Sequence, residues 1–138
     1  MSSKLNLKDC FIIHLERSLE RKPQVRKLKK NLPYRTTVIE AVDGSNPDND
    51  FSRSYTPRLL RPFYPFSLRS AEAACFQSHR KCWQEILDRG LEATLIIEDD
   101  VDIIDGEFAT AVKLAMKEIK KGDLIRFPMK PREKPRNR

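Results

Sequence analysis

Short apolar runs recur along the chain at intervals that leave room for helices between them. Cys10–Leu15 lies between charged residues, and its length and neighbouring isoleucines favour a buried strand over a helix. Residues 36–41 and 93–97 are similarly rich in β-branched side chains and predict two further strands. Residues 123–127 predict a fourth. The apolar runs therefore predict a sheet with at least four strands.

Helical periodicity predicts three helices between these strands. The first begins near Pro23, which suits an opening helical turn. The second covers 71–88, with Ser70 as its N-cap and Gly90 as its C-terminal glycine, and the third covers 107–121. The inward face of the second helix is expected to present Cys75, Ser78 or His79, Cys82 and Ile86.

The alternation of strands and helices implies an α/β sheet with helices on its faces. A chain of 138 residues suits one domain, which we expect over residues 1–127. Residues 45–69 lack periodicity and hold four of the nine prolines and five of the eleven aromatic residues. They predict a long loop, which either serves function or packs on the core through its aromatic side chains.

Most of the net positive charge lies at the C-terminal end. Residues 126–138 contain six basic side chains against one acidic one, so they carry +5 of the chain's net +7. The basic, proline-rich tail at 128–138 can meet phosphates or an anionic membrane surface, or it is a solvated end. Because it lacks interleaved aromatic residues, nucleic acid is not an expected partner, and a nucleic-acid-binding module is the weakest alternative.

Cysteine content and hydropathy favour a cytoplasmic protein. Three irregularly spaced cysteines are too few for a disulfide framework and do not match a zinc knuckle, so reduced thiols are expected. No uncharged apolar run approaches the roughly 20 residues that a membrane helix needs. The first residues do not lead into the apolar segment of a signal peptide.

Four carboxylates follow the strand predicted at 93–97. In an extended chain the two-residue period would place Glu98, Asp100 and Asp102 on one side, with Asp99 on the other. Oxygen ligands so grouped suit magnesium or manganese better than zinc. The alternative is an acidic turn that only solvates the end of the strand.

Polar residues also follow the first two predicted strands. Arg17, Ser18 and Arg21 come after the first strand, where guanidinium groups can grip a phosphate or remain solvated. Asp43 and Gly44 form a turn signal after the second strand. From that position, Asp43 could also accept hydrogen bonds from a ribose or a base.

Taken in order, these segments resemble glycosyltransferase family 25, the family of bacterial lipooligosaccharide and animal collagen galactosyltransferases. The resemblance covers residues 10–127. It implies a GT-A-like fold, a UDP-sugar donor and transfer of a hexose such as galactose to a glycan hydroxyl. Its motifs are Leu15-Glu-Arg-Ser-Leu-Glu-Arg21, Glu40-Ala-Val-Asp-Gly44, Glu72 with Ser78-His79 and Trp83, and Leu95-Ile-Ile-Glu-Asp-Asp-Val101.

The resemblance also implies site residues. Glu98-Asp-Asp100 would be the counterpart of the Asp-x-Asp metal motif, and a manganese or magnesium ion is the expected cofactor. The expected donor-binding set is Arg17, Arg21, Asp43, Gly44, Ser78 and His79. The general base is not assigned, and His79 and Asp102 are the candidates. Taken alone, His79 is more typical of a core histidine.

Two features of the chain depart from the family pattern. His14 stands where the family commonly has asparagine, and family members continue beyond the strand matched by 124–127. We therefore expect a fold truncated after 123–127, which either transfers sugar or is a non-catalytic donor-binding remnant. The expected acceptor is a lipooligosaccharide, lipopolysaccharide or other glycan at the cytoplasmic face of the inner membrane. Peripheral membrane contact through the tail and self-association are further expectations.

Overall fold

The computed structural model describes residues 4–48, 69–103 and 106–127. The expected basic tail at 128–138 and nearly all of the expected loop at 45–69 lie outside the described residues. The described residues form two compact units, one of residues 6–102 and one made of residues 4–5 with 103–127. Whether residues 1–127 act as one domain stays a prediction.

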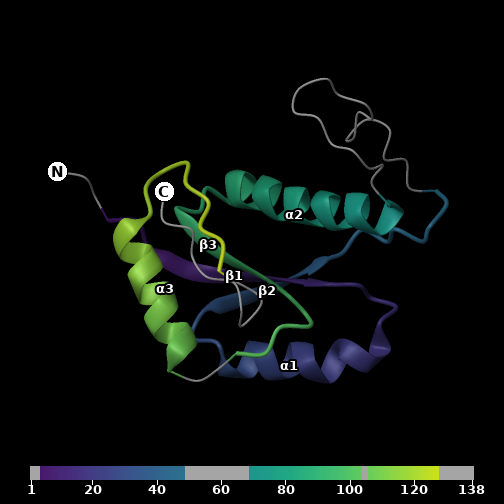
Figure 1. Ribbon diagram of the computed structural model, residues 1–138, viewed down its shortest axis with the longest axis horizontal. Coiled ribbons are helices and arrows are strands. Elements are labelled where there is room, and N and C mark those ends of the chain that lie inside the picture. Colours follow the sequence, from purple (N-terminus) through teal and green to yellow (C-terminus); the bar gives the residue numbers. More distant parts are fainter. Residues whose placement is uncertain (1–3, 49–68, 104–105, 128–138) are drawn as a thin grey trace. The chain divides into compact units, whose positions relative to one another are not determined.

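A three-stranded parallel sheet forms the centre of the larger unit (Figure 1). Its strands are β1 (Leu7–His14), β2 (Arg35–Glu40) and β3 (Ala93–Glu98), in the order β2-β1-β3. The sequence prediction of strands in these three places is confirmed. Since all three strands are parallel, their carboxyl ends meet at one edge of the sheet.

Two helices cover opposite faces of this sheet (Figure 1). A 3-10 turn, η1 (Leu19–Arg21), leads into α1 (Lys22–Asn31) on one face, and α2 (Ser70–Arg89) covers the other. The β-α-β order and the α/β class expected from the sequence are confirmed. The first crossover runs from β1 to β2, and the second returns in the opposite direction from β2 past β1 to β3. Right-handed crossovers in opposite directions place their helices on opposite faces, which explains this arrangement.

The central strand divides its side chains between the two helices. Phe11 and Ile13 pack with Cys82 of α2 in a hydrophobic cluster. Cys10 and Ile12, which alternate with them, are fully buried on the other face. Glu98 of β3 is the register partner of Ile13, so its side chain points to the α2 face.

Helix α2 differs from the expectation at its start. Arg69, not Ser70, is the N-cap, with an extended backbone, and its N–H donates to Glu72 Oε2 over 3.4 Å. Gly90 ends the helix in the left-handed conformation (φ 63°), as predicted.

The inward face of α2 also differs in part from the prediction. Ser78 and Cys82 are buried, but Cys75 is exposed and His79 is half-buried. A 20-residue helix is about 30 Å long and a six-residue strand about 20 Å, so α2 is longer than β3. Cys75 and His79 lie in the N-terminal half of α2, beside the end of β3.

The second unit contains α3 (Glu107–Glu118), which is shorter than the predicted helix 107–121. It ends because Ile119 turns to an extended backbone and the Lys120 N–H donates to Asp123 Oδ2 over 2.9 Å. The strand predicted at 123–127 is wrong: these residues are irregular and Leu124 is 76% exposed. A strand requires a neighbouring strand that pairs with its backbone groups, and apolar composition alone does not supply one.

Candidate functional site

The candidate site is the edge at which the three parallel strands end. His14, Glu40 and Glu98 are the last residues of β1, β2 and β3. Open α/β sheets bind ligands beyond the carboxyl ends of their strands, because the loops that follow neighbouring strands converge there. The polar residues that follow the three strands are therefore expected to lie at this edge.

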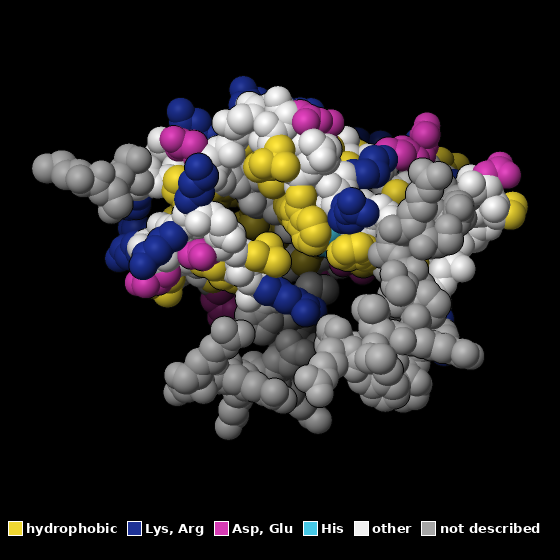
Figure 2. Space-filling view, turned by 90° about the horizontal axis from the view of Figure 1, so that it is seen from above, with side chains coloured by type: hydrophobic (Ala, Val, Ile, Leu, Met, Phe, Trp, Pro, Cys, Tyr) yellow, Lys and Arg dark blue, Asp and Glu magenta, His cyan; other side chains and the backbone are white. Residues whose placement is uncertain are grey.

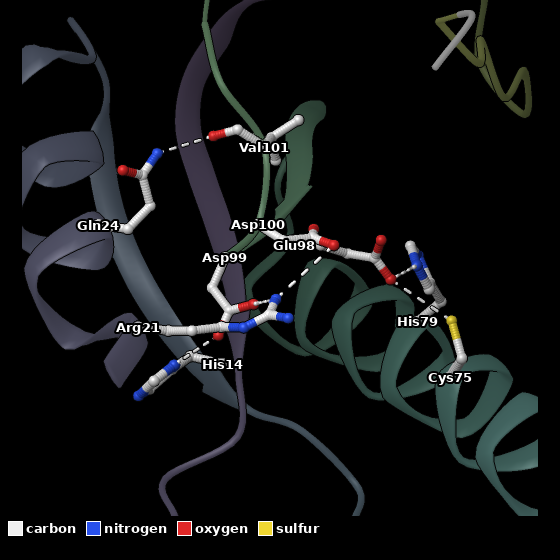
Figure 3. Close-up of polar contacts among 9 residues, drawn as sticks. All are labelled: His14, Arg21, Gln24, Cys75, His79, Glu98, Asp99, Asp100 and Val101. Carbon is white, nitrogen blue, oxygen red and sulfur yellow. Dashed lines mark hydrogen bonds and ion pairs between the residues drawn. The ribbon is translucent and has the colours of Figure 1, made fainter. Parts of the chain in front are cut away.

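A buried carboxylate lies at the centre of this edge. Asp99 accepts a hydrogen bond from His14 Nδ1–H at Oδ2 (2.7 Å) and one from Arg21 at Oδ1 (2.9 Å) (Figure 3). Its backbone N–H also donates to the carbonyl of Ile13 over 3.1 Å. We call His14, Arg21 and Asp99 the Asp99 network. Its hydrogen bonds tie the end of β3 to the end of β1 and to η1.

The partners of Asp99 were missed in the sequence analysis. His14 was singled out only as a departure from the family pattern. A histidine at the end of one strand and an acidic run after another strand are nevertheless compatible with a histidine–carboxylate pair. In the structure His14 is 7% exposed, and its Nε2 has no hydrogen-bond partner among the described residues. Arg21, predicted to bind donor phosphate, directs one guanidinium nitrogen to Asp99.

Glu98 faces the opposite way and meets two side chains of α2 (Figure 3). Cys75 Sγ donates to Glu98 Oε1 over 3.4 Å, and His79 Nε2 lies 3.8 Å from the same oxygen. We call Cys75, His79 and Glu98 the Glu98 cluster. Partial desolvation of the thiol raises the pKa of Cys75, and the charge of Glu98 adds to this effect.

The carboxylates after Glu98 do not continue an extended chain. Residues 99–100 form a turn, and the Val101 N–H donates to the Glu98 carbonyl over 3.3 Å. Asp100 Oδ2 lies 3.7 Å from Arg21, and Asp102 Oδ1 accepts from Gln24 over 3.4 Å. Among the described side chains, the expected metal ligands Glu98, Asp100 and Asp102 do not form one compact group of ligand atoms.

Two residues of the predicted donor set meet beside this edge. Arg17 Nε lies 2.8 Å from Asp43 Oδ2, and another guanidinium nitrogen donates to Asp43 Oδ1 over 3.1 Å and to Ser45 Oγ over 2.8 Å. Hydrogen bonds from the side chain and backbone of Ser45 hold the pKa of Asp43 below its ordinary value, and the Arg17 charge lowers it further. The structure thus places a guanidinium group and a carboxylate of the predicted set together.

The other predicted donor residues have structural contacts of their own. Ser78 is buried, accepts from the Val42 N–H over 2.9 Å and donates to the Ala74 carbonyl over 2.8 Å. Gly44 lies against the first turn of α2, where a Cβ would come within 2.7 Å of the Ser70 carbonyl oxygen. Both residues therefore hold the segment after β2 against α2.

Two comparisons relate the chain to proteins that transfer sugars. The model of glycosyltransferase family 25 (LPS biosynthesis protein) matches residues 7–133. Procollagen galactosyltransferase 2 of Mus musculus is 32% identical over 126 residues, which are 88% of this chain and 20% of the relative. Procollagen galactosyltransferase 1 of Danio rerio is 30% identical over 104 residues, 72% of this chain and 17% of the relative.

The relatives also include a protein named as inactive. The inactive glycosyltransferase 25 family member 3 of Mus musculus is 29% identical over 107 residues, 75% of this chain and 18% of the relative. The chain spans about one fifth of the length of these curated relatives. The comparison with solved structures gives no match. Among the described residues, no helix is both long and apolar enough to cross a membrane.

Proposed function

The chain belongs to glycosyltransferase family 25, and on this basis we propose that the carboxyl edge of its sheet binds the UDP-sugar donor of a hexosyl transfer. The observation that carries the proposal is the family match over residues 7–133, which includes all three strand ends. The names of the relatives favour galactose as the sugar. The proposed acceptor is a hydroxyl group of a lipooligosaccharide, a lipopolysaccharide or another glycan.

The arginines at this edge are suited to a diphosphate. The side chains of Arg17 and Arg21 are 63% and 43% exposed, so both can still reach a ligand. Guanidinium groups bind phosphate oxygens through paired, charge-assisted hydrogen bonds. Asp43, next to Arg17, is proposed to accept hydrogen bonds from the ribose.

The carboxylates at the end of β3 and after it are proposed to bind a divalent cation. Glu98, Asp100 and Asp102 offer the oxygen ligands that magnesium and manganese prefer, and the Asp100 side chain is 52% exposed. These three residues are the proposed ligands. When bound, such a cation would neutralise charge on the diphosphate.

In the proposed reaction, the oxygen of the acceptor hydroxyl attacks the anomeric carbon of the donor sugar. The bond from that carbon to the diphosphate oxygen breaks, and UDP leaves with the bonding electrons. Arg17 and Arg21 stabilise the negative charge that develops on UDP. The hydroxyl proton passes to a base, for which His79 and Asp102 are the candidates.

Calorimetric titration of the chain with UDP, in magnesium or manganese, tests donor binding. Replacing Arg17 with alanine should weaken binding by about 1.5–3 kcal/mol, the scale of a charge-assisted hydrogen bond. Lys29→Ala, on the exposed face of α1, is the matched control and should change the affinity little. Equal small losses from both variants would mean that Arg17 is an ordinary solvated charge.

The relative named as inactive favours a second candidate, a donor-binding protein without turnover. The two candidates differ in one measurement, the transfer of galactose from UDP-galactose to a glycan acceptor. Transfer that is lost in Arg17→Ala supports the enzyme. UDP binding without transfer to either a lipooligosaccharide or a collagen polypeptide supports the second candidate, and absence of UDP binding contradicts both.

A further inference from the structure

We propose that Cys75, His79 and Glu98 form a binding site for a borderline divalent cation of the zinc class. The three residues offer a thiolate, an imidazole and a carboxylate, the ligand types that zinc accepts together. Their ligand atoms all lie within 4.8 Å of one another. No other such group occurs among the residues for which the structure gives side chains.

The spacing between the ligand atoms matches a tetrahedral ion. Zinc bonds of about 2.0–2.3 Å at tetrahedral angles separate neighbouring ligands by about 3.3–3.6 Å. Cys75 Sγ and His79 Nε2 lie 3.4 Å and 3.8 Å from Glu98 Oε1. The observed separations therefore require only a small adjustment of exposed or half-exposed side chains.

The local structure holds the three ligands in place. Cys75 and His79 are four residues apart on α2, so they project from the same side of the helix. Glu98 is the last residue of β3, where its hydrogen-bonded neighbours fix the backbone. Two ligands from a helix and one from a strand end make a site that is largely formed by the fold.

Charge and access also favour an ion here. One thiolate and one carboxylate balance the two positive charges of the cation, and His79 binds as a neutral ligand. The Glu98 and His79 side chains are 35% and 33% exposed, so an ion can enter from solvent. Figure 2 shows that the face on the α2 side carries exposed hydrophobic side chains beside lysines and arginines; on α2, Phe76 and Trp83 are among the exposed hydrophobic residues.

The chemistry separates this site from the donor cation proposed above. Sulfur and nitrogen ligands favour zinc, cobalt or nickel, whereas magnesium prefers oxygen ligands alone. Three protein ligands leave a fourth position of a tetrahedral ion for water or an external group. Glu98 belongs to both proposed ligand sets, so zinc bound here is expected to lower the effect of magnesium on UDP binding.

Titration of the untagged, metal-free chain with Zn²⁺, without nucleotide, tests the site. We expect one ion per chain and a loss of affinity of more than about tenfold in each of Cys75→Ser, His79→Gln and Glu98→Gln. Asp88→Asn removes an exposed carboxylate elsewhere on α2, which accepts from Gln84, and should bind zinc as the wild type does. Unchanged affinity in Cys75→Ser and His79→Gln would overturn the proposal.

Two further measurements use the wild-type chain, so they do not depend on whether the variants fold. Zn²⁺ should protect Cys75 from alkylation, while the buried Cys10 and Cys82 provide internal controls. Trp83 is the only tryptophan, and its ring centroid lies 6.4 Å from that of His79, so Co²⁺ should quench its fluorescence. Alkylation of Cys75 at the same rate with and without Zn²⁺ would contradict the site. Because no UDP is present, this outcome is independent of donor binding.

Discussion

Glu98 and Asp99 are consecutive residues, yet the Glu98 cluster and the Asp99 network are opposite environments. Asp99 is 7% exposed, and each of its oxygens accepts a hydrogen bond from a nitrogen of His14 or Arg21. Glu98 is about one third exposed and meets a thiol and an imidazole. Glu98 ends β3 and meets α2, whereas Asp99 opens the turn that follows and meets Arg21 of η1.

The difference in exposure between Asp99 and Glu98 gives the two neighbouring carboxylates different roles. A buried carboxylate is costly unless charged or hydrogen-bonding partners surround it, so Asp99 is held in one arrangement. Its role is to position the end of β3 and the guanidinium group of Arg21. Glu98 keeps access to solvent, and its nearest polar side chains among the described residues are a thiol and an imidazole, which leaves it accessible to a ligand.

The largest expected effect comes from removing the charge of Asp99. Asp99→Asn should lower the free energy of unfolding by about 3 kcal/mol, since hydrogen bonds to charged groups contribute about 1.5–3 kcal/mol each and Arg21 is partly solvated. Glu98→Gln, at the neighbouring position, should cost less than about 0.5 kcal/mol, as for most substitutions outside the core. Urea unfolding at neutral pH measures both.

Equal losses of unfolding free energy in the two variants would contradict the contrast between Asp99 and Glu98. They would mean that the Asp99 network contributes no more to the fold than the half-exposed Glu98 cluster. A loss in Glu98→Gln alone would reverse the assignment of the two roles.

The next effect tests whether the Glu98 cluster depends on the position of α2. In Gly44→Ala the new Cβ would come within 2.7 Å of the Ser70 carbonyl oxygen and 2.9 Å of Ala71 Cα, so α2 or the segment after β2 must shift. We expect a loss of about 1–3 kcal/mol of stability, the usual cost of overpacking. Thermal unfolding measures this loss.

The same variant discriminates between the two regions. The rate at which Cys75 reacts with iodoacetamide should change, because a shift of α2 moves the thiol relative to Glu98. The Asp99 network contains no residue of α2, so the resonances of the His14 ring should move less. An unaltered Cys75 rate together with a displaced His14 ring would contradict the separation.

The smallest effect concerns Asp9, a second buried carboxylate among the described residues. It lies near the amino end of β1, where Arg35 donates to its two oxygens over 2.7 Å and 3.2 Å. These hydrogen bonds hold its pKa below the ordinary value of 3.8 in spite of burial. A depressed pKa stabilises the fold above the ordinary value, and the gain is lost as the pH falls through the pKa of the folded state.

Acid titration of stability checks this sign. The difference in unfolding free energy between the wild type and Asp9→Asn should be constant above about pH 5 and should shrink as the pH falls below about 4. A difference that does not depend on pH would show that Arg35 does not stabilise the ionised form. Burial beside an arginine would then not by itself explain the expected contribution of Asp99 to stability.

The local elements follow from residue patterns. The β-branched runs determine three strands, and Gly90 ends α2 because it accepts a positive φ at no steric cost. The acidic run and the arginines after β1 were predicted at the sheet edge because each directly follows an apolar run that predicts a strand. The prediction of a strand at 123–127 is wrong because apolar composition alone does not provide a neighbouring strand with which to pair.

Contacts between distant segments were decided only by the tertiary structure. The sequence alone determined that Glu98, Asp99 and Asp100 follow a buried strand, and it left open which of them is buried. Asp99 is buried because of the turn at 99–100 and its hydrogen bonds to His14 and Arg21. Pairs such as His14 with Asp99, 85 residues apart, depend on strand register and helix placement, which are set by packing over the whole sheet and not by any local pattern.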